Sequence, residues 1–380
     1  MDRRAFLSAG IALAFAACTR TPTAFPRPSP GRSGPSRYGS LRAPDENGIR
    51  LPAGFRSRVI ATSNDRVEGT RFVWHRAPDG GATFASPGGG WIYVSNSEVS
   101  ARGGAGAIRF AADGTVEDAY RILGGTTRNC AGGPTPWGTW LSCEEFSRGR
   151  VWECDPMGER AAVVRPALGV FQHEAAVVDP QGRRLYLTED EPDGRFYRFT
   201  PAAYPSLDDG VLEAMRRSGD GGVEWIAVDD PSAGRMPTRR QTSEASRFRG
   251  GEGCWFDDAT RTAFFTTKGD DRVWAYRPDA ERIEVLYDGR RQRGALSGVD
   301  NVVVTPAGDV LVAEDGGTME LVLITTDGDV TPLVRVDGQR GSELTGPAFD
   351  PSGTRLYFSS QRGGHGDGIT YEVSGPFVAR

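Results

Sequence analysis

The chain has 380 residues, of which 38% are hydrophobic and 25% charged, a composition typical of one large globular domain or two smaller ones. Its formal net charge of −5 gives no basic footprint, which argues against nucleic-acid binding. The 51 glycines and 25 prolines are spread between short β-branched and aromatic runs, which favours a turn-rich all-β protein over disorder.

Residues 1–18 have the features of an export signal. The arginine pair Arg3 and Arg4 precedes an apolar run that ends at Ala17 and is too short to span a bilayer. The pair resembles a twin-arginine signal, and the FAAC sequence that ends at Cys18 resembles a lipobox. Two outcomes stay open, because Cys18 either carries a lipid or is removed by simple cleavage. Residues 19–50 are rich in Pro, Ser and Arg, so we expect a tether there.

A repeated strand pattern dominates residues 51–380. Short strands that end in polar residues recur, and their last apolar residues are Val94, Leu141, Leu187, Phe265, Val312 and Phe358. Four of the five intervals are 46 or 47 residues, and the single interval of 78 indicates an insertion at about 200–245. A period of 40–50 residues is typical of β-propellers and rare in the alternative, a β-sandwich. The sequence therefore predicts an all-β, six-bladed β-propeller.

Tight turns align the repeated units with one another. The sequences DPQG at 179–182, DDAT at 257–260, TPAG at 305–308 and DPSG at 350–353 occupy the same position between the first two strands of their units. In an antiparallel hairpin the start of the first strand and the end of the second lie at the same end. Six blades around one axis would bring both positions into a single funnel.

Acidic residues and a thiol occupy these funnel positions. We predict seven metal ligands there: Cys143, Glu144, Glu174, Glu189, Glu252, Asp300 and Glu314. So many negative charges around one axis cannot all ionise cheaply without cations. Carboxylates suit a hard cation such as calcium, whereas a thiolate favours a transition metal such as iron. The chain has only three histidines, so a histidine-rich zinc site is not expected, and His173 could be a ligand or an outer-shell partner.

Three further cysteines, Cys130, Cys154 and Cys254, could form a disulfide in an exported protein or remain thiols. Two cations stand where other units have polar or acidic residues. Lys268 and Arg362 are the predicted catalytic residues, because a positive group beside a metal cluster can grip an anion and stabilise a transferring phosphoryl group. Each could instead be a salt-bridge partner that neutralises the acids.

Several long segments resemble the PhoX-type alkaline phosphatases. They are WGTWLSCEE (137–145), FQHEAAVVDP (171–180), LYLTEDE (185–191), GGEGCWFD, FTTKGDDRVW and GVDNVVV. The resemblance implies an exported six-bladed propeller that hydrolyses phosphate monoesters at a cluster of Fe3+ and Ca2+. It also implies that Cys143 is an iron ligand and that the matching carboxylates are shared between iron and calcium. The chain is shorter than the best-known members of that family.

The leading hypothesis is a monomeric metallophosphatase for small phosphate esters, periplasmic or tethered to the membrane by an N-terminal lipid. A calcium-dependent lactonase is a second hypothesis, which needs one or two calcium ions and no thiolate. The third is a non-catalytic propeller that binds a protein or polysaccharide partner, as the fold alone permits. That case predicts no bound metal.

Overall fold

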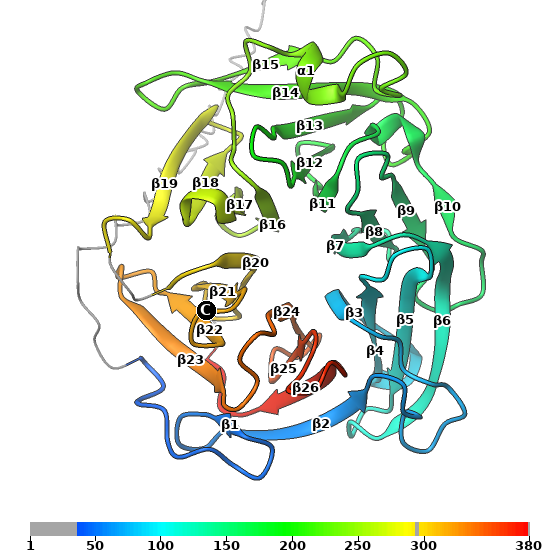
Figure 1. Ribbon diagram of the computed structural model, residues 1–380, viewed down its shortest axis with the longest axis vertical. Helices are drawn as coiled ribbons and strands as arrows, with labels where there is room; N and C mark the ends of the chain where they lie inside the picture. The colour runs from blue at the N-terminus through cyan, green and yellow to red at the C-terminus, as the bar shows by residue number, and fades with distance from the viewer. Residues whose placement is uncertain (1–35, 293–295, 379–380) are drawn as a thin grey trace, which may run out of the picture.

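The protein is a β-propeller of six antiparallel sheets around a central axis (Figure 1). The computed structural model describes residues 36–292 and 296–378. The predicted export signal and residues 19–35 of the tether lie outside the described residues. The prediction of an all-β, six-bladed propeller is confirmed.

Each blade begins with its innermost strand. Blade one contains β3 (Pro78–Ala85), β4 (Trp91–Ser97), β5 (Gly103–Phe110) and β6 (Val116–Thr126), and blade two contains β7 (Asn129–Pro134), β8 (Trp140–Glu144), β9 (Val151–Cys154) and β10 (Val163–Val164). Blade three contains β11 (His173–Asp179), β12 (Arg184–Glu189), β13 (Phe196–Pro201), β14 (Gly210–Arg217) and β15 (Val223–Ala227).

The second half of the ring repeats the same order. Blade four contains β16 (Gly251–Asp257), β17 (Thr262–Thr267), β18 (Arg272–Arg277) and β19 (Arg282–Asp288). Blade five contains β20 (Val299–Val304), β21 (Val310–Glu314), β22 (Glu320–Ile324), β23 (Val330–Val336) and β1 (Ile49–Arg50). Blade six contains β24 (Leu344–Phe349), β25 (Arg355–Ser360), β26 (Ile369–Ser374) and β2 (Arg56–Thr62).

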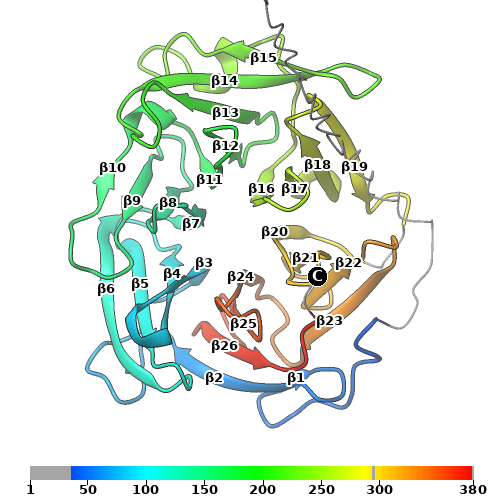
Figure 2. The same ribbon diagram turned by 180° about the vertical axis from the view of Figure 1, so that it is seen from behind.

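The two ends of the described chain close the ring. β2 is the outer strand of blade six, where it pairs with β26, and β1 pairs with β23 in blade five. Figure 2 shows β2 and β1 running along the outside of these two blades. Backbone hydrogen bonds between these N-terminal strands and blades five and six therefore close the ring. The strand β1 lies inside the segment that was expected to be a tether, so the folded part begins at or before Ile49.

The sequence markers fall on equivalent strands. The six apolar marker residues all lie on the second strand of a blade, namely β4, β8, β12, β17, β21 and β25. The long interval corresponds to blade three, which has the extra strand β15 and the short helix α1 (Thr238–Gln241) at its outer edge (Figure 1). The other short helical turns are η1 (Pro87–Gly89), η2 (Pro166–Leu168) and η3 (Lys268–Asp270). Within the described ranges, every helix is too short to cross a membrane.

The hydrophobic core lies between neighbouring blades. Leu141 and Val151 of blade two pack against Leu187 and Phe199 of blade three. Sheets that pack face to face in this way remove the apolar side of each strand from water. The inner strands then face one another across the axis, where polar side chains from every blade can meet.

Candidate metal centre

Each of the six inner strands carries a β-bulge near its start. Two residues of the inner strand face a single residue of the second strand in every blade. The first residues of the six bulges are Asp79, Cys130, Glu174, Glu252, Asp300 and Gly346. A bulge changes the direction of a side chain and is common beside active sites. Five of the six blades therefore offer one acidic or thiol side chain at the same level of the axis.

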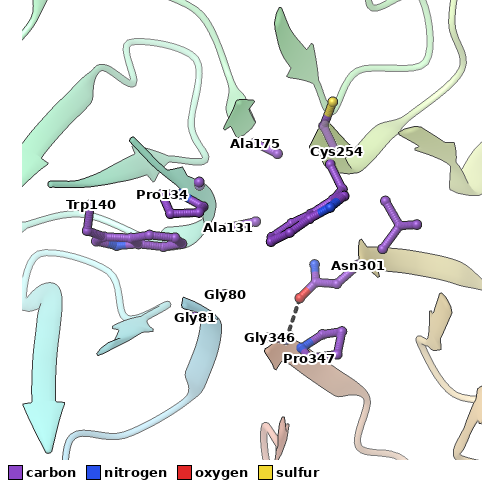
Figure 3. Close-up of a pocket in the computed structure, with 15 residues that line it drawn as sticks. Gly80, Gly81, Ala131, Pro134, Trp140, Ala175, Cys254, Asn301, Gly346 and Pro347 are labelled. Carbon is purple, nitrogen blue, oxygen red and sulfur yellow. Dashed lines mark hydrogen bonds between the residues drawn. The ribbon is translucent and has the colours of Figure 1, made fainter. Parts of the chain in front are cut away.

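The next residue in each bulge lines a small cavity on the axis. These residues are Gly80, Ala131, Ala175, Gly253, Asn301 and Pro347, and the cavity has a volume of about 30 Å³ (Figure 3). A Cβ atom on Gly80 would lie 2.5 Å from the Cα of Ala131, which is closer than packed atoms approach, so only glycine fits there. Small residues thus let the inner strands approach one another and bring the neighbouring acids close together.

The acids and the thiol form four linked groups around the axis. In each of four groups the potential ligand atoms lie within 4.8 Å of one another: Cys130, Glu145 and Glu174; Glu174, Glu252 and Asp300; Asp300, Asp315 and Glu343; and Asp79, Glu98 and Glu343. Three residues, Glu174, Asp300 and Glu343, belong to two groups each. We call these nine residues the acid ring.

Glu174 gives the clearest sign that the acid ring is built for cations. Its side chain is 0% exposed, and neither carboxylate oxygen has a hydrogen-bond partner in the described structure. Burial, reinforced by the charge of Glu252, raises the pKa of Glu174 well above its usual range. An ionised carboxylate buried without a partner is strongly unfavourable. Bound cations would remove this conflict, so the residues present fit a metal centre.

Other members of the acid ring are perturbed in the same direction. Burial, with the added charges of Glu98 and Asp190, raises the pKa of Glu145 to about 9. Burial and Asp300 raise the pKa of Glu343 to about 9. For Asp79, burial and Glu98 raise the pKa to about 8. Without cations these carboxyl groups hold protons at neutral pH.

The thiol among the carboxylates is Cys130, whereas Cys143 lies elsewhere. Burial and the charges of Asp79 and Glu174 raise the pKa of the Cys130 thiol well above its usual range. Cys143 is 0% exposed and packs in the apolar cluster between blades two and three with Leu141 and Val151. All four cysteines of the described chain, Cys130, Cys143, Cys154 and Cys254, are free thiols.

The structure also separates three of the predicted carboxylate ligands from the acid ring. Glu144 accepts a hydrogen bond from the backbone N–H of Thr127 at 3.0 Å. Glu189 accepts one from the Tyr197 hydroxyl at 2.8 Å, and Glu314 accepts one from the backbone N–H of Glu320 at 3.1 Å. These three carboxylates brace the loops at the strand ends, and none of them belongs to a group of potential ligand atoms in the described residues.

Strand geometry explains this division. Successive side chains of a strand point to opposite faces, so a residue and its neighbour in the sequence do not share a direction. Glu144, Glu189 and Glu314 precede Glu145, Asp190 and Asp315, and it is the later residue of each pair that faces the acids of other blades. The last apolar residues do not show that the three are equivalent, because Glu189 and Glu314 stand two residues after Leu187 and Val312, whereas Glu144 stands three residues after Leu141.

Seven residues near the axis were not among the predicted ligands: Asp79, Glu98, Cys130, Glu145, Asp190, Asp315 and Glu343. A signal for two of them is present in the sequence. PDGG around Asp79 and NCAG around Cys130 place small residues directly after the potential ligand, as HEAA and GEGC do around Glu174 and Glu252. Comparing these tetrapeptides, rather than counting back from the turn, would have found both. His173 is buried away from the acids, with its Nε2 3.1 Å from the carbonyl oxygen of Gly169.

The two predicted catalytic residues, Lys268 and Arg362, lie beside the acid ring. The Nζ of Lys268 is 3.1 Å from both Glu252 and Asp315. Burial opposes the charge of Lys268, but Asp300 and its other acidic neighbours outweigh burial and raise the pKa of the ammonium group. Arg362 lies 2.9 Å from Glu343, and its side chain is 49% exposed. The side chains of Lys268 and Arg362 therefore stay positively charged, and each is partly exposed, so that it could bind an anion.

Comparisons with solved structures agree with this fold. Among solved structures, PhoX from Pseudomonas fluorescens in complex with vanadate, a transition state analogue, is 16% identical, with 88% of this chain and 97% of that chain covered and a TM-score of 0.74. A gluconolactonase from Xanthomonas campestris is 14% identical, with 89% and 98% covered and a TM-score of 0.55. Identities this low show a shared fold. No curated protein matches the sequence.

The sequence matches the family model for alkaline phosphatase PhoX in three overlapping segments, residues 73–151, 146–281 and 274–364. Together they include the inner strands of all six blades and every residue of the acid ring. Because the match covers more than half of the chain and follows the propeller from blade one to blade six, the protein belongs to the PhoX family of alkaline phosphatases and is a phosphatase.

Proposed function

We propose that this phosphatase hydrolyses phosphate monoesters at a cluster of Fe3+ and Ca2+ held by the acid ring. Membership of the PhoX family implies metal dependence. The buried, unpartnered carboxylate of Glu174 is the observation that carries the proposal. The soft thiolate of Cys130 favours iron, while carboxylate oxygens suit calcium. Glu174 belongs to both the thiol-containing group and an all-carboxylate group, so it would be a ligand common to the iron-binding and calcium-binding parts of the acid ring.

The chemistry divides between the cations and the protein's own side chains. When bound, the cations would supply Lewis-acid polarisation of the phosphoryl group. Lys268 and Arg362 would bind the phosphate oxygens and stabilise the charge that develops on them. Their acidic partners, Glu252, Asp315 and Glu343, hold the two cationic side chains at the edge of the acid ring, so that little reorganisation is needed when the ester binds.

The two cysteines should behave differently when replaced. We expect Cys130→Ala to lose bound iron and at least about 90% of the activity toward a chromogenic phosphate ester, because it removes the thiolate from the acid ring. Cys143→Ala should keep both iron and activity, and it should cost about 1–2 kcal/mol of stability through loss of buried apolar contact. Elemental analysis, rates and thermal unfolding of both variants test this. Iron loss in the Cys143 variant alone would restore the sequence-based assignment of that residue.

Lys268 is expected to act on the anion. Lys268→Met should weaken competitive inhibition by inorganic phosphate by about tenfold and lower kcat/KM by about a hundredfold. The metal content, measured by elemental analysis on the same sample, should change little. An unaltered inhibition constant would leave Lys268 only as a neutralising partner of Glu252 and Asp315.

The location of the protein and the rival lactonase activity are two further points. We propose export to the periplasm or a lipid-tethered position, as the arginine pair and Cys18 of the sequence suggest. Elemental analysis of protein recovered from its native export route should find iron and calcium. Calcium alone, together with lactone turnover and no phosphatase activity, would instead favour a lactonase with this fold.

A further inference from the structure

The insertion in blade three reaches the loop between β12 and β13 through one arginine. Arg239, on α1, lies 3.2 Å from Glu189, 3.0 Å from Glu191 and 3.1 Å from Asp193. These three carboxylates come from one five-residue stretch, 189–193. The guanidinium group of Arg239 is planar and offers five hydrogen-bond donors, so this one side chain can bind all three carboxylates at once. No other blade has this extra helix in the part of the chain that the structure describes.

The contact with Glu189 is buried and charge-matched. The Glu189 side chain is 0% exposed, whereas that of Arg239 is 15% exposed. Glu189 also accepts hydrogen bonds from the Tyr197 hydroxyl and from the backbone N–H of Arg195. A buried carboxylate with this many donors is fixed in position. The position of α1 is fixed as well, because the Thr238 hydroxyl donates a buried hydrogen bond of 2.9 Å to the carbonyl oxygen of Val170.

The loop that Arg239 holds carries Asp190 to the edge of the acid ring. The side-chain amide of Gln172 donates to Glu145 at 2.9 Å and to Asp190 at 3.3 Å. Asp190 therefore shares a donor with a member of the acid ring. The charge of Asp190 also contributes to the raised pKa values of Glu145 and Glu252, as expected for a carboxylate that faces the same cluster.

The same loop contacts the strand entrance of blade four. The carbonyl oxygen of Glu191 accepts a hydrogen bond of 2.9 Å from Gly250, and the carbonyl oxygen of Gly250 accepts one of 2.8 Å from Lys268. Two residues after Gly250 comes Glu252, a member of the acid ring. A displacement of residues 189–193 would thus move Asp190 and disturb the backbone that carries Lys268.

We propose that Arg239 is a positioning residue of the metal centre, which clamps residues 189–193 so that Asp190 faces the acid ring. This inference rests on the proposed function, in which the acid ring binds calcium. It also gives the blade-three insertion a role, since the insertion supplies the helix on which the clamp is built. Arg239 contacts the three carboxylates of residues 189–193 and would act on the metal centre only through that loop.

Calcium binding to the metal-free protein tests the clamp without any measurement of activity. Arg239→Met should weaken calcium binding, measured by titration calorimetry, by about tenfold, which is the range seen when outer-shell partners of a metal ligand are removed. Arg239→Lys should give an intermediate loss, because an ammonium group cannot bind three carboxylates in the guanidinium geometry. Arg240→Met is the matched control, because the Arg240 side chain is 57% exposed and its one ion pair among the described residues is with Asp193, at 3.0 Å. We expect its calcium affinity to equal that of the wild type.

A second pair of variants separates positioning from simple stabilisation. Arg239→Met leaves Glu189 buried without its cation, which destabilises the fold. Adding Glu189→Gln should recover thermal stability but leave calcium binding weak, because the clamp on the loop is still missing. Should Arg239→Met fail to fold, Glu191→Gln removes one partner of the clamp at a side chain that is 21% exposed, and it should also weaken calcium binding.

The outcomes distinguish this inference from the proposed function. Wild-type protein that binds no calcium would overturn the proposed metal site and the clamp with it. Wild-type protein that binds calcium, with equal affinity in the Arg239→Met and Glu191→Gln variants, would overturn the clamp alone. Recovery of both stability and calcium affinity in the Arg239→Met, Glu189→Gln double variant would also overturn it, because Arg239 would then serve only to neutralise Glu189.

Discussion

Glu174→Gln should make the metal-free protein more stable and the enzyme inactive. Glu174 is fully buried, has no hydrogen-bond partner among the described residues and lies among like charges. Removing its ability to ionise should therefore raise the free energy of unfolding of the metal-free protein at pH 8 by about 1–3 kcal/mol. The same change removes a ligand shared by two groups of potential ligands, so we expect the phosphatase rate to fall at least about a hundredfold. Denaturant unfolding after chelation, and rates with a chromogenic ester, measure the two effects.

Glu314→Gln is the matched control for this experiment. Both carboxylates are buried, but that of Glu314 accepts hydrogen bonds from the backbone N–H groups of Ser297, Thr318 and Glu320. Replacing it should destabilise the metal-free protein by about 1–3 kcal/mol, and the metal content should stay unchanged. A Glu174 variant that loses stability in the same way would mean that its carboxylate is satisfied by a partner other than a cation, and the proposed metal site would lose its main support.

Repetition made the fold predictable. The markers such as Leu141, Leu187 and Val312 recur at a nearly constant spacing because each blade buries the same strand against its neighbour. That spacing requires only the apolar side of one strand, which a single sequence displays directly. The interval of 78 residues predicts an insertion at about 200–245, but periodicity alone does not predict the strand β15 and the helix α1 that lie there.

The candidate site was only partly predictable, because the bulges are not visible as periodicity. The fifth residue before the turn is Glu174, Glu252 or Asp300 in blades three to five, and the structure brings these three together. In blade six the fifth residue before the turn is Thr345, whereas the bulge there holds Gly346 and Pro347. Each bulge adds one residue to one strand only, so the position that faces the axis changes between the two strands of a hairpin. A shift of one residue moves a side chain to the opposite face, and Glu144, Glu189 and Glu314 each stand one residue before an acid that lies near the axis.

The thiol shows the same limit for a second reason. Cys143 and Cys130 both lie near the end of a strand. Cys143 is the thiol ligand predicted from the sequence, because it stands beside Glu144 and Glu145. Tertiary packing decides between them, since Cys143 fills an apolar gap between two blades while Cys130 occupies a bulge at the axis. A cysteine can occupy either kind of site, because a protonated thiol behaves as a small hydrophobic group and an ionised thiol can bind a metal.

The stability of the metal-free protein is expected to fall as the pH rises from about 5 to about 9. Burial and neighbouring charges raise the pKa of Asp79 from 3.8 to about 8, and that of Glu145 and Glu343 from 4.5 to about 9. In the unfolded chain these groups ionise near pH 4, so between the two limits the folded state holds more protons than the unfolded state. Stability is then fully present below about pH 4 and is lost as the pH rises through the folded pKa values. Each proton involved contributes roughly 1.4 kcal/mol per pH unit.

Cations should reverse this dependence, because they replace the protons of the acid ring. Metal binding requires ionised ligands and releases protons, so it strengthens as the pH rises. The melting temperature of the chelated protein should therefore drop between pH 6 and pH 9, whereas the gap between loaded and chelated protein should widen over the same range. Calorimetric melting of both forms at four pH values measures this. A chelated protein that becomes more stable toward pH 9 would show that these carboxyl groups are already ionised and paired, and the acid ring would then not need cations to keep its charge.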